Sequence, residues 1–165
     1  MAPFDVLNVQ NHEIQELSKV LGALIKEREL CDTDIVTSLF RQYIGKVLEH
    51  IELNSKSIYT LLLASPDSKI KSQVARFMEG EQEIKKIFNG YVARYCKNGL
   101  QIKDHDVFLK ESQQMFRLVL KRIQAEFEEL YPLARRVEQK QVLGMKHPPA
   151  LAGEHIFQAG TCRIN

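Results

Sequence analysis

The sequence of 165 residues contains no long apolar run. Its uninterrupted apolar stretches are a few residues long, whereas a membrane-spanning helix requires about 20. Residues 1–14 also lack a basic region followed by an apolar stretch, so a secretory signal is not expected. These absences argue against an integral membrane protein, and they predict a cytoplasmic protein with no membrane partner.

Cysteine is scarce as well. The chain has three cysteines, and their odd number and wide spacing do not suit a disulfide framework. None of them lies in a recognisable nucleophile motif, so we assign them no catalytic role. They indicate a reducing compartment, which agrees with a cytoplasmic location. The three residues are Cys31, Cys96 and Cys162.

An excess of one charge is also missing, because 23 basic side chains balance 21 acidic ones and leave a net charge of +2. No long run of either sign occurs, and aromatic residues do not alternate with basic ones, so we expect no nucleic-acid partner. The chain has no hydrolase triad motif, glycine-rich phosphate loop or dinucleotide-binding fingerprint. An enzyme is therefore the least expected class.

Apolar residues at helical spacing are what the chain does contain. Hydrophobic residues make up 44% of it and charged residues 27%, which predicts one domain with a buried core. Apolar positions recur at intervals of three and four, without the alternation or hairpin turns typical of strands. The pattern predicts four helices. They span residues 9–30, 34 to about 65, 66 to about 98, and 104 or 106 to 130.

Short connections between four long helices predict an all-α fold, an up-down-up-down four-helix bundle over residues 1–138. Pro132 is expected to kink or end the fourth helix. Residues 139–165 contain a proline pair and glycines. This composition predicts a C-terminal tail that is flexible or packs along the bundle.

Two stretches of the chain are similar at an offset of 72 residues: HIELNSKSIY at residues 50–59 and RIQAEFEELYPL at residues 122–133. In each stretch the first and fifth residues are four apart and project from one face of a helix. This geometry suits two side chains that serve one buried site. The alignment pairs His50 with Arg122, Ile51 with Ile123, Asn54 with Glu126, Ile58 with Leu130 and Tyr59 with Tyr131.

The same stretches resemble the hemerythrin-like, or HHE, cation-binding family, whose usual sequence there is close to H-I-x-x-E-E-x-x-L-Y-P. The resemblance covers roughly residues 9–133. It implies a bundle that holds a non-haem di-iron centre. Helices one and three would each supply a His, and helices two and four would each supply a His and a Glu.

Helices two and four retain half of the ligands that the resemblance implies. His50 matches the His of helix two, but Asn54 stands where its carboxylate is expected. Glu126 matches the Glu of helix four, but Arg122 stands where its His is expected. Each of these helices therefore keeps one ligand type and has lost the other.

Helices three and one depart further from the family pattern. The family His of helix three precedes an apolar residue by three, which places Glu81 there, with Gln82 as the alternative register. By the same rule Asn11 takes the position in helix one. His12 is one residue away, or about 100° around the helix.

Two hypotheses for the site follow. An iron site would require convergence of His12, His50, Glu81 and Glu126, but the guanidinium of Arg122 cannot ligate and would repel a cation. We therefore expect no cofactor, with iron as the alternative, and a buried polar cluster in which Arg122 pairs with Glu126 or Glu81. In this cluster Arg122 would also hydrogen-bond to His50 and Asn54, because buried charges must be paired. The expected members are Asn11, His50, Asn54, Glu81, Arg122 and Glu126.

Other readings of the same residues remain open. If helix four is rotated by one residue, Arg122 points outward and Glu126 and Glu129 are solvated; His50 on its own would then be an ordinary core histidine. Glu79, Glu81 and Glu83 alternate and so spread around their helix, and at least two of the three are expected on its solvated face. The histidines and cysteine near the C-terminus match no standard metal-site spacing. These residues are His147, His155 and Cys162.

A bundle without its metal acts through its surface, so we expect a non-enzymatic regulatory or signalling protein, of bacterial type, that contacts another protein. Ser57-Ile58-Tyr59 is also similar to a segment of anti-sigma regulators of the Rsd/AlgQ type, which implies a sigma factor as one partner class. The rival hypothesis is an iron protein that senses oxygen, nitric oxide or redox state. A homo-oligomer is a third hypothesis, suggested by the apolar residues Phe4, Phe40 and Phe157, which are expected at the surface.

Overall fold

The computed structural model describes residues 3–146. Within this range the chain is all-α and contains no strand, which confirms the predicted fold class. Helix α1 spans Pro3–Leu24 and is followed by a short 3-10 turn, η1, at Leu30–Asp32. Helix α2 spans Asp34–Leu53. It continues without a break through a π-helical segment, η2, at Asn54–Tyr59 and into α3 at Thr60–Leu63.

The second half of the chain repeats this arrangement. Helix α4 spans Ser68–Tyr95 and α5 spans His105–Ala125. Helix α5 then continues through a second π-helical segment, η3, at Glu126–Leu130 and into α6 at Tyr131–Lys146. Each half therefore consists of one long helix followed by a second that contains a π-helical segment.

Side-chain caps begin three of the long helices. The Thr33 hydroxyl accepts a hydrogen bond from the Val36 N–H, 3.4 Å away, at the start of α2. Carboxylate oxygens of Asp67 and Asp104 accept from backbone N–H groups at the starts of α4 and α5. Caps of this kind satisfy backbone donors that have no partner inside the helix. They explain why these helices begin close to the positions that the sequence predicts.

Four predicted boundaries differ from the structure: both ends of the first helix, the end of the fourth helix and the start of the tail. Helix α1 begins at Pro3 and ends at Leu24, because buried Phe4 and Leu7 extend its apolar face toward the N-terminus. Pro132 does not end its helix: it follows η3 directly, where the backbone hydrogen bonds reach to the fifth residue and the regular α-helical ladder, which a proline would interrupt, is already altered. Residues 139–146, assigned to the tail, belong to α6.

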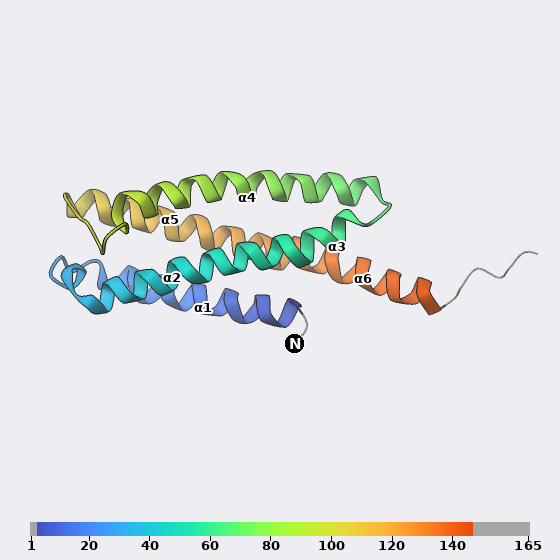
Figure 1. Cartoon of the computed structure of the whole chain (residues 1–165), viewed down its shortest axis with the longest axis horizontal. Coiled ribbons are helices and arrows are strands. Elements are labelled where there is room, and N and C mark those ends of the chain that lie inside the picture. Colours follow the sequence, from blue (N-terminus) through green and yellow to red (C-terminus); the bar gives the residue numbers. More distant parts are fainter. Residues whose placement is uncertain (1–2, 147–165) are drawn as a thin grey trace, which may run out of the picture.

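The helices pack lengthwise, and Figure 1 shows consecutive long segments running in opposite directions. Helix α1 packs against α2 and α5, and α4 packs against α3 and α5. The short helix α3 also packs against α6. Residues from all four long segments therefore face one shared interior.

Buried apolar residues form two core clusters along this interior. The first cluster is rich in aromatic rings and includes Phe40, Tyr43 and Phe116; the Tyr43 and Phe116 rings meet edge to face. The second cluster includes Phe4 and Leu62 near the start of α1. Phe4 and Phe40 are thus buried, and their predicted exposure is wrong. Phe157 lies outside the described residues. No helix in the described part of the chain has the length and apolarity needed to cross a membrane.

Candidate functional site

Polar side chains fill the interior between the two core clusters. On each long segment an inward polar residue lies between an apolar residue of the first cluster and one of the second; for example, Glu126 lies between Ile123 and Leu130. The side chains that are joined by hydrogen bonds or an ion pair form what we term the polar cluster. Its members are His50, Asn54, Tyr59, Glu81, Arg122, Glu126 and Tyr131. At its edge the Ser55 hydroxyl donates to Glu81 Oε1 at 3.3 Å.

Glu126 is the centre of the polar cluster and is only 2% exposed. Its Oε2 accepts hydrogen bonds from His50 Nε2 at 2.8 Å and from Asn54 Nδ2 at 3.0 Å. Its Oε1 accepts from Arg122 Nε at 2.5 Å. Because an ionised carboxylate only accepts, the proton of the first bond belongs to His50 Nε2. Both oxygens of Glu126 are therefore engaged by donors from three helical segments.

The Tyr59 hydroxyl joins the second carboxylate to Arg122. It donates to Glu81 Oε2 at 2.7 Å and accepts from Arg122 Nη2 at 2.6 Å. The direct separation of Arg122 Nη2 from Glu81 Oε2 is 4.0 Å. The guanidinium also lies 4.9 Å from the centre of the Phe77 ring, within the range of a cation–π interaction. Arg122 is thus held between two buried carboxylates and an aromatic ring.

The ion pair keeps Glu126 and Arg122 charged although both are largely removed from water. Burial alone would raise the pKa of Glu126, but the hydrogen bond and charge of His50 and the charge of Arg122 outweigh it, and the pKa lies below its ordinary value. Burial likewise works against the charge of Arg122, but Glu126 and the neighbouring groups raise its pKa. Each charged group stabilises the other in its ionised form.

The expected hydrogen bonds differ in one respect from those found. His50 and Asn54 donate to Glu126, and neither is hydrogen-bonded to Arg122 as we predicted. The physical reason is that one N–H group of each of the three side chains points at Glu126, whose two oxygens accept all three bonds, while Asn54 Oδ1 and His50 Nδ1 have no partner among the described residues. The side chain of Arg122 is only 13% exposed, so the alternative in which it points outward is wrong.

The first helix places one of its two candidates near the site. Asn11 is buried on α1 near the Tyr131 hydroxyl, but no hydrogen bond found among the described residues joins it to the polar cluster. The neighbouring His12 is exposed and does not converge with His50, Glu81 or Glu126, because one residue turns it away from the interior. The predicted four-residue ligand set is therefore not assembled.

The remaining candidates fall where a solvated helix face would place them. Gln82, the alternative to Glu81, is exposed, as are Glu79 and Glu83.

The cysteines within residues 3–146 have no catalytic environment. Free Cys31 is buried, and burial raises the pKa of the Cys96 thiol to about 11, so Cys96 is protonated at neutral pH. The predictions for the C-terminal segment lie outside the described residues: His147, His155 and Cys162.

Sequence reasoning missed the parts played by the two tyrosines. Tyr59 connects Glu81 with Arg122, and the Tyr131 hydroxyl lies 3.5 Å from Glu126 Oε2. A signal was present, because the repeat aligns these tyrosines with each other. The aligned pair Tyr59 and Tyr131 follows the aligned polar pair Asn54 and Glu126 by five residues. This arrangement indicates that the hydroxyl groups belong to the same polar site as Asn54 and Glu126.

The residues of the polar cluster do not fit a di-iron centre. His50 Nε2 and both oxygens of Glu126 are turned toward each other and toward Arg122. The cavity beside them has a volume of about 20 Å³, which is close to the space of one water molecule. In the described part of the chain no group of three or more His, Cys, Asp or Glu side chains is arranged to hold a metal ion.

Comparison with known proteins gave no match among family models, curated proteins or solved structures. The comparisons therefore do not show a family for this chain. What can be inferred about function rests on the polar cluster and on the surface around it.

Proposed function

We propose that this protein is a hemerythrin-like, up-down-up-down four-helix bundle that acts in the bacterial cytoplasm as a non-enzymatic regulatory or signalling protein through protein–protein contacts. The observation that carries this proposal is the ion pair of Arg122 with Glu126. A fixed positive charge occupies the place where the family resemblance implies a metal ligand, and it satisfies the carboxylate that would otherwise bind a cation.

The closed geometry of the polar cluster supports a role without catalysis. Glu81 and Glu126 are buried, and each accepts hydrogen bonds from its neighbours. A general acid or base must reach its substrate, whereas these groups are enclosed by helices. The polar cluster therefore serves the interior of the bundle, and interaction with other molecules falls to the surface.

The surface supports this view because large apolar side chains remain exposed on several helices. They include Ile35 on α2, Ile87 on α4 and Phe127 on η3. Exposed aromatic and aliphatic side chains are typical anchors of protein interfaces. The weaker resemblance to anti-sigma regulators makes a primary sigma factor the first partner class to examine.

One experiment with two readouts tests this proposal. The affinity-tagged protein is produced in iron-supplemented medium and its iron content is measured; the same tagged chain is cross-linked in bacterial cells, and bound proteins are identified. We expect substoichiometric iron in the natural chain, and iron uptake by the double variant Arg122→His with Asn54→Glu, which restores the implied ligand types. The matched control makes the same substitutions at exposed sites, Arg117→His with Asn89→Glu.

The readouts separate two ways in which the proposal can fail. Near-stoichiometric iron in the natural chain would establish a metal protein and overturn the metal-free assignment. If the double variant folds, as judged by circular dichroism, but takes up no more iron than the control, the hemerythrin-like placement is wrong. The absence of any cross-linked protein would contradict a role through protein–protein contacts.

A further inference from the structure

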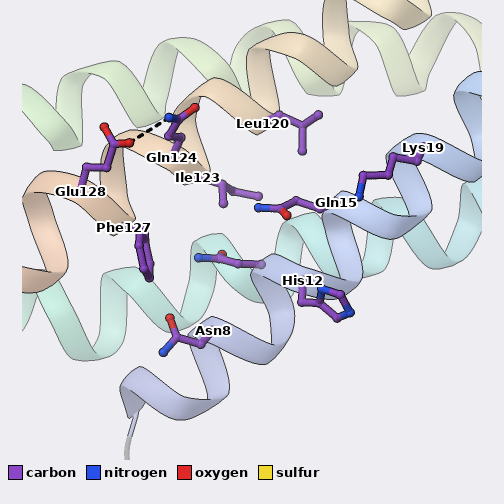
Figure 2. A pocket seen from close by; sticks show the side chains of 10 residues that line it. Asn8, His12, Gln15, Lys19, Leu120, Ile123, Gln124, Phe127 and Glu128 are labelled. Atoms are coloured by element: carbon purple, nitrogen blue, oxygen red, sulfur yellow. Dashed lines mark hydrogen bonds between the residues drawn. The ribbon is translucent and has the colours of Figure 1, made fainter.

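A groove lies on the surface between α1 and the α5–η3 segment, on the far side of Asn11 from the polar cluster. We term it the α1–α5 groove; it has a volume of about 550 Å³ and is bounded by Asn8, Asn11, Gln15, Gln124 and Phe127, among others. Figure 2 shows the side chains of α1 facing those of α5 and η3 across it. This volume is within the range of about 300 to 1,000 Å³ that is typical of ligand sites.

The floor of the α1–α5 groove has a polar atom without a partner. Asn11 is 6% exposed, and its Oδ1 makes no hydrogen bond with any described residue. A buried acceptor without a donor destabilises the folded protein, so such atoms are uncommon. A ligand that brings an N–H group to Asn11 would remove this destabilisation. Asn11 Oδ1 is therefore an acceptor that is available to a hydrogen-bond donor of a ligand.

Carboxamides are arranged in a line along one wall. Asn8, Asn11 and Gln15 are spaced by three and four residues, which puts them on one face of α1 at intervals of about 4.5 and 6 Å. An extended peptide turns its main-chain polar groups to one side about every 6.6 Å. Each carboxamide offers both a donor and an acceptor, as a peptide group does. This side of the groove thus offers the same hydrogen-bonding groups as the edge of a peptide chain, and the interval from Asn11 to Gln15 is close to the repeat of an extended peptide.

Phe127 forms an apolar wall across from this line and is 59% exposed. It comes from η3, and Figure 2 shows its ring at the same end of the groove as Glu128, while Lys19 lies at the other end. In an extended peptide the side chains point alternately to opposite sides. One such side chain can pack on the exposed ring of Phe127 while the main-chain groups face the carboxamides. Lys19 is paired with Glu16 at 2.7 Å, whereas Glu128 accepts a hydrogen bond from the neutral side chain of Gln124. The charge of Glu128 therefore favours a basic residue at the Phe127 end of the groove.

We propose that the α1–α5 groove binds an extended peptide segment of a partner protein. Main-chain groups of the segment hydrogen-bond to Asn11 and its neighbouring carboxamides, and an apolar side chain packs on Phe127. This inference rests on the proposed function, because it names the surface through which the protein contacts its partner. It does not depend on whether the interior binds iron.

The test uses the full chain and a phage-displayed library of random linear peptides. Enriched peptides are synthesised, labelled and measured for binding to the natural protein by fluorescence polarisation. We expect enriched sequences with an apolar residue next to a basic one, and binding weakened by about tenfold or more in Phe127→Ala, as for a central interface residue. The control Ile35→Ala removes an apolar side chain that is 69% exposed on α2, outside the groove, and should leave binding unchanged.

Several outcomes would overturn the inference. One is a library selection that yields no enriched peptide, and another is enriched peptides that bind Phe127→Ala as tightly as the natural chain. Competition by a synthetic peptide of residues 147–165 would make the chain's own C-terminal segment the occupant. Self-association that Phe127→Ala abolishes in sedimentation would make a second copy the occupant. None of these results alters the iron measurement, so failure here is distinguishable from failure of the metal-free assignment.

Discussion

The two π-helical segments occupy equivalent places in the two halves of the chain but contribute different chemistry. Asn54, at the start of η2, and Glu126, at the start of η3, are 72 residues apart and hydrogen-bonded to each other. Tyr43 and Met115 are also 72 residues apart, and the Tyr43 hydroxyl lies 3.7 Å from the Met115 sulfur. Equivalent positions of the repeat therefore meet across the interior.

The difference between the halves is one of charge. The first half supplies His50, Asn54 and Tyr59, with no carboxylate and no guanidinium. The second half supplies the charged groups Glu81, Arg122 and Glu126. A repeated backbone can thus keep polar residues at equivalent positions while their chemistry differs between the copies. Here one copy supplies the ion pair, and the other supplies hydrogen bonds that stabilise it.

Removing the central carboxylate should have the largest effect. Glu126→Leu leaves the guanidinium of Arg122 without its nearest partner, and loss of one member of a buried ion pair costs about 3–5 kcal/mol. The equivalent change in the other half, Asn54→Leu, removes one hydrogen bond to Glu126 and should cost about 1–2 kcal/mol. Urea unfolding followed by circular dichroism measures both free energies. Equal losses would show that the two halves do not differ as described.

Acid should remove part of the contribution of Glu126. Its pKa is lowered in the folded protein, so its ionised form contributes stability above the ordinary carboxyl value of 4.5, and this contribution is lost as the pH falls through the folded pKa. We expect the melting temperature of the natural chain to fall more steeply below about pH 4.5 than that of Glu126→Gln. Parallel curves for the two proteins would assign the acid sensitivity to other carboxylates.

The two equivalent tyrosines provide the finest comparison, since each variant loses one oxygen atom. Tyr59→Phe removes hydrogen bonds at 2.6 and 2.7 Å to charged groups and should cost about 2 kcal/mol. Tyr131→Phe removes a 3.5 Å contact with Glu126 and should cost about 0.5 kcal/mol. Thermal and urea unfolding of both variants give the values. A larger loss for Tyr131→Phe would reverse the assigned importance of the two hydroxyl groups.

Much of the helical architecture could be predicted because apolar spacing and capping residues are local signals. The three-residue rule placed Asn11 and Glu81 toward the interior, where both are buried. The error at Phe40 was avoidable: together with Val36, Tyr43 and Val47 it follows one helical stripe. Local periodicity is informative wherever a helix keeps its regular period.

The pairing inside the polar cluster could not be predicted in the same way. It depends on η2 and η3, where hydrogen bonds reach to the fifth residue and change the direction of every side chain that follows. The residues of these segments carry no distinctive composition. Donor and acceptor types alone do not choose the partner of His50, because its imidazole can donate to Glu126 or accept from Arg122.

The second core cluster has a consequence for the order of folding. Phe4 and Leu7, at the start of α1, are covered by Leu133 and Val137, on α6. The ring of Phe4 also meets that of Tyr131 edge to face and lies under the guanidinium of Arg135. During synthesis the ribosome makes Phe4 early and Val137 more than a hundred residues later. This part of the core therefore stays incomplete until α6 leaves the exit tunnel, and until then Phe4 and Leu7 lack the cover that α6 provides.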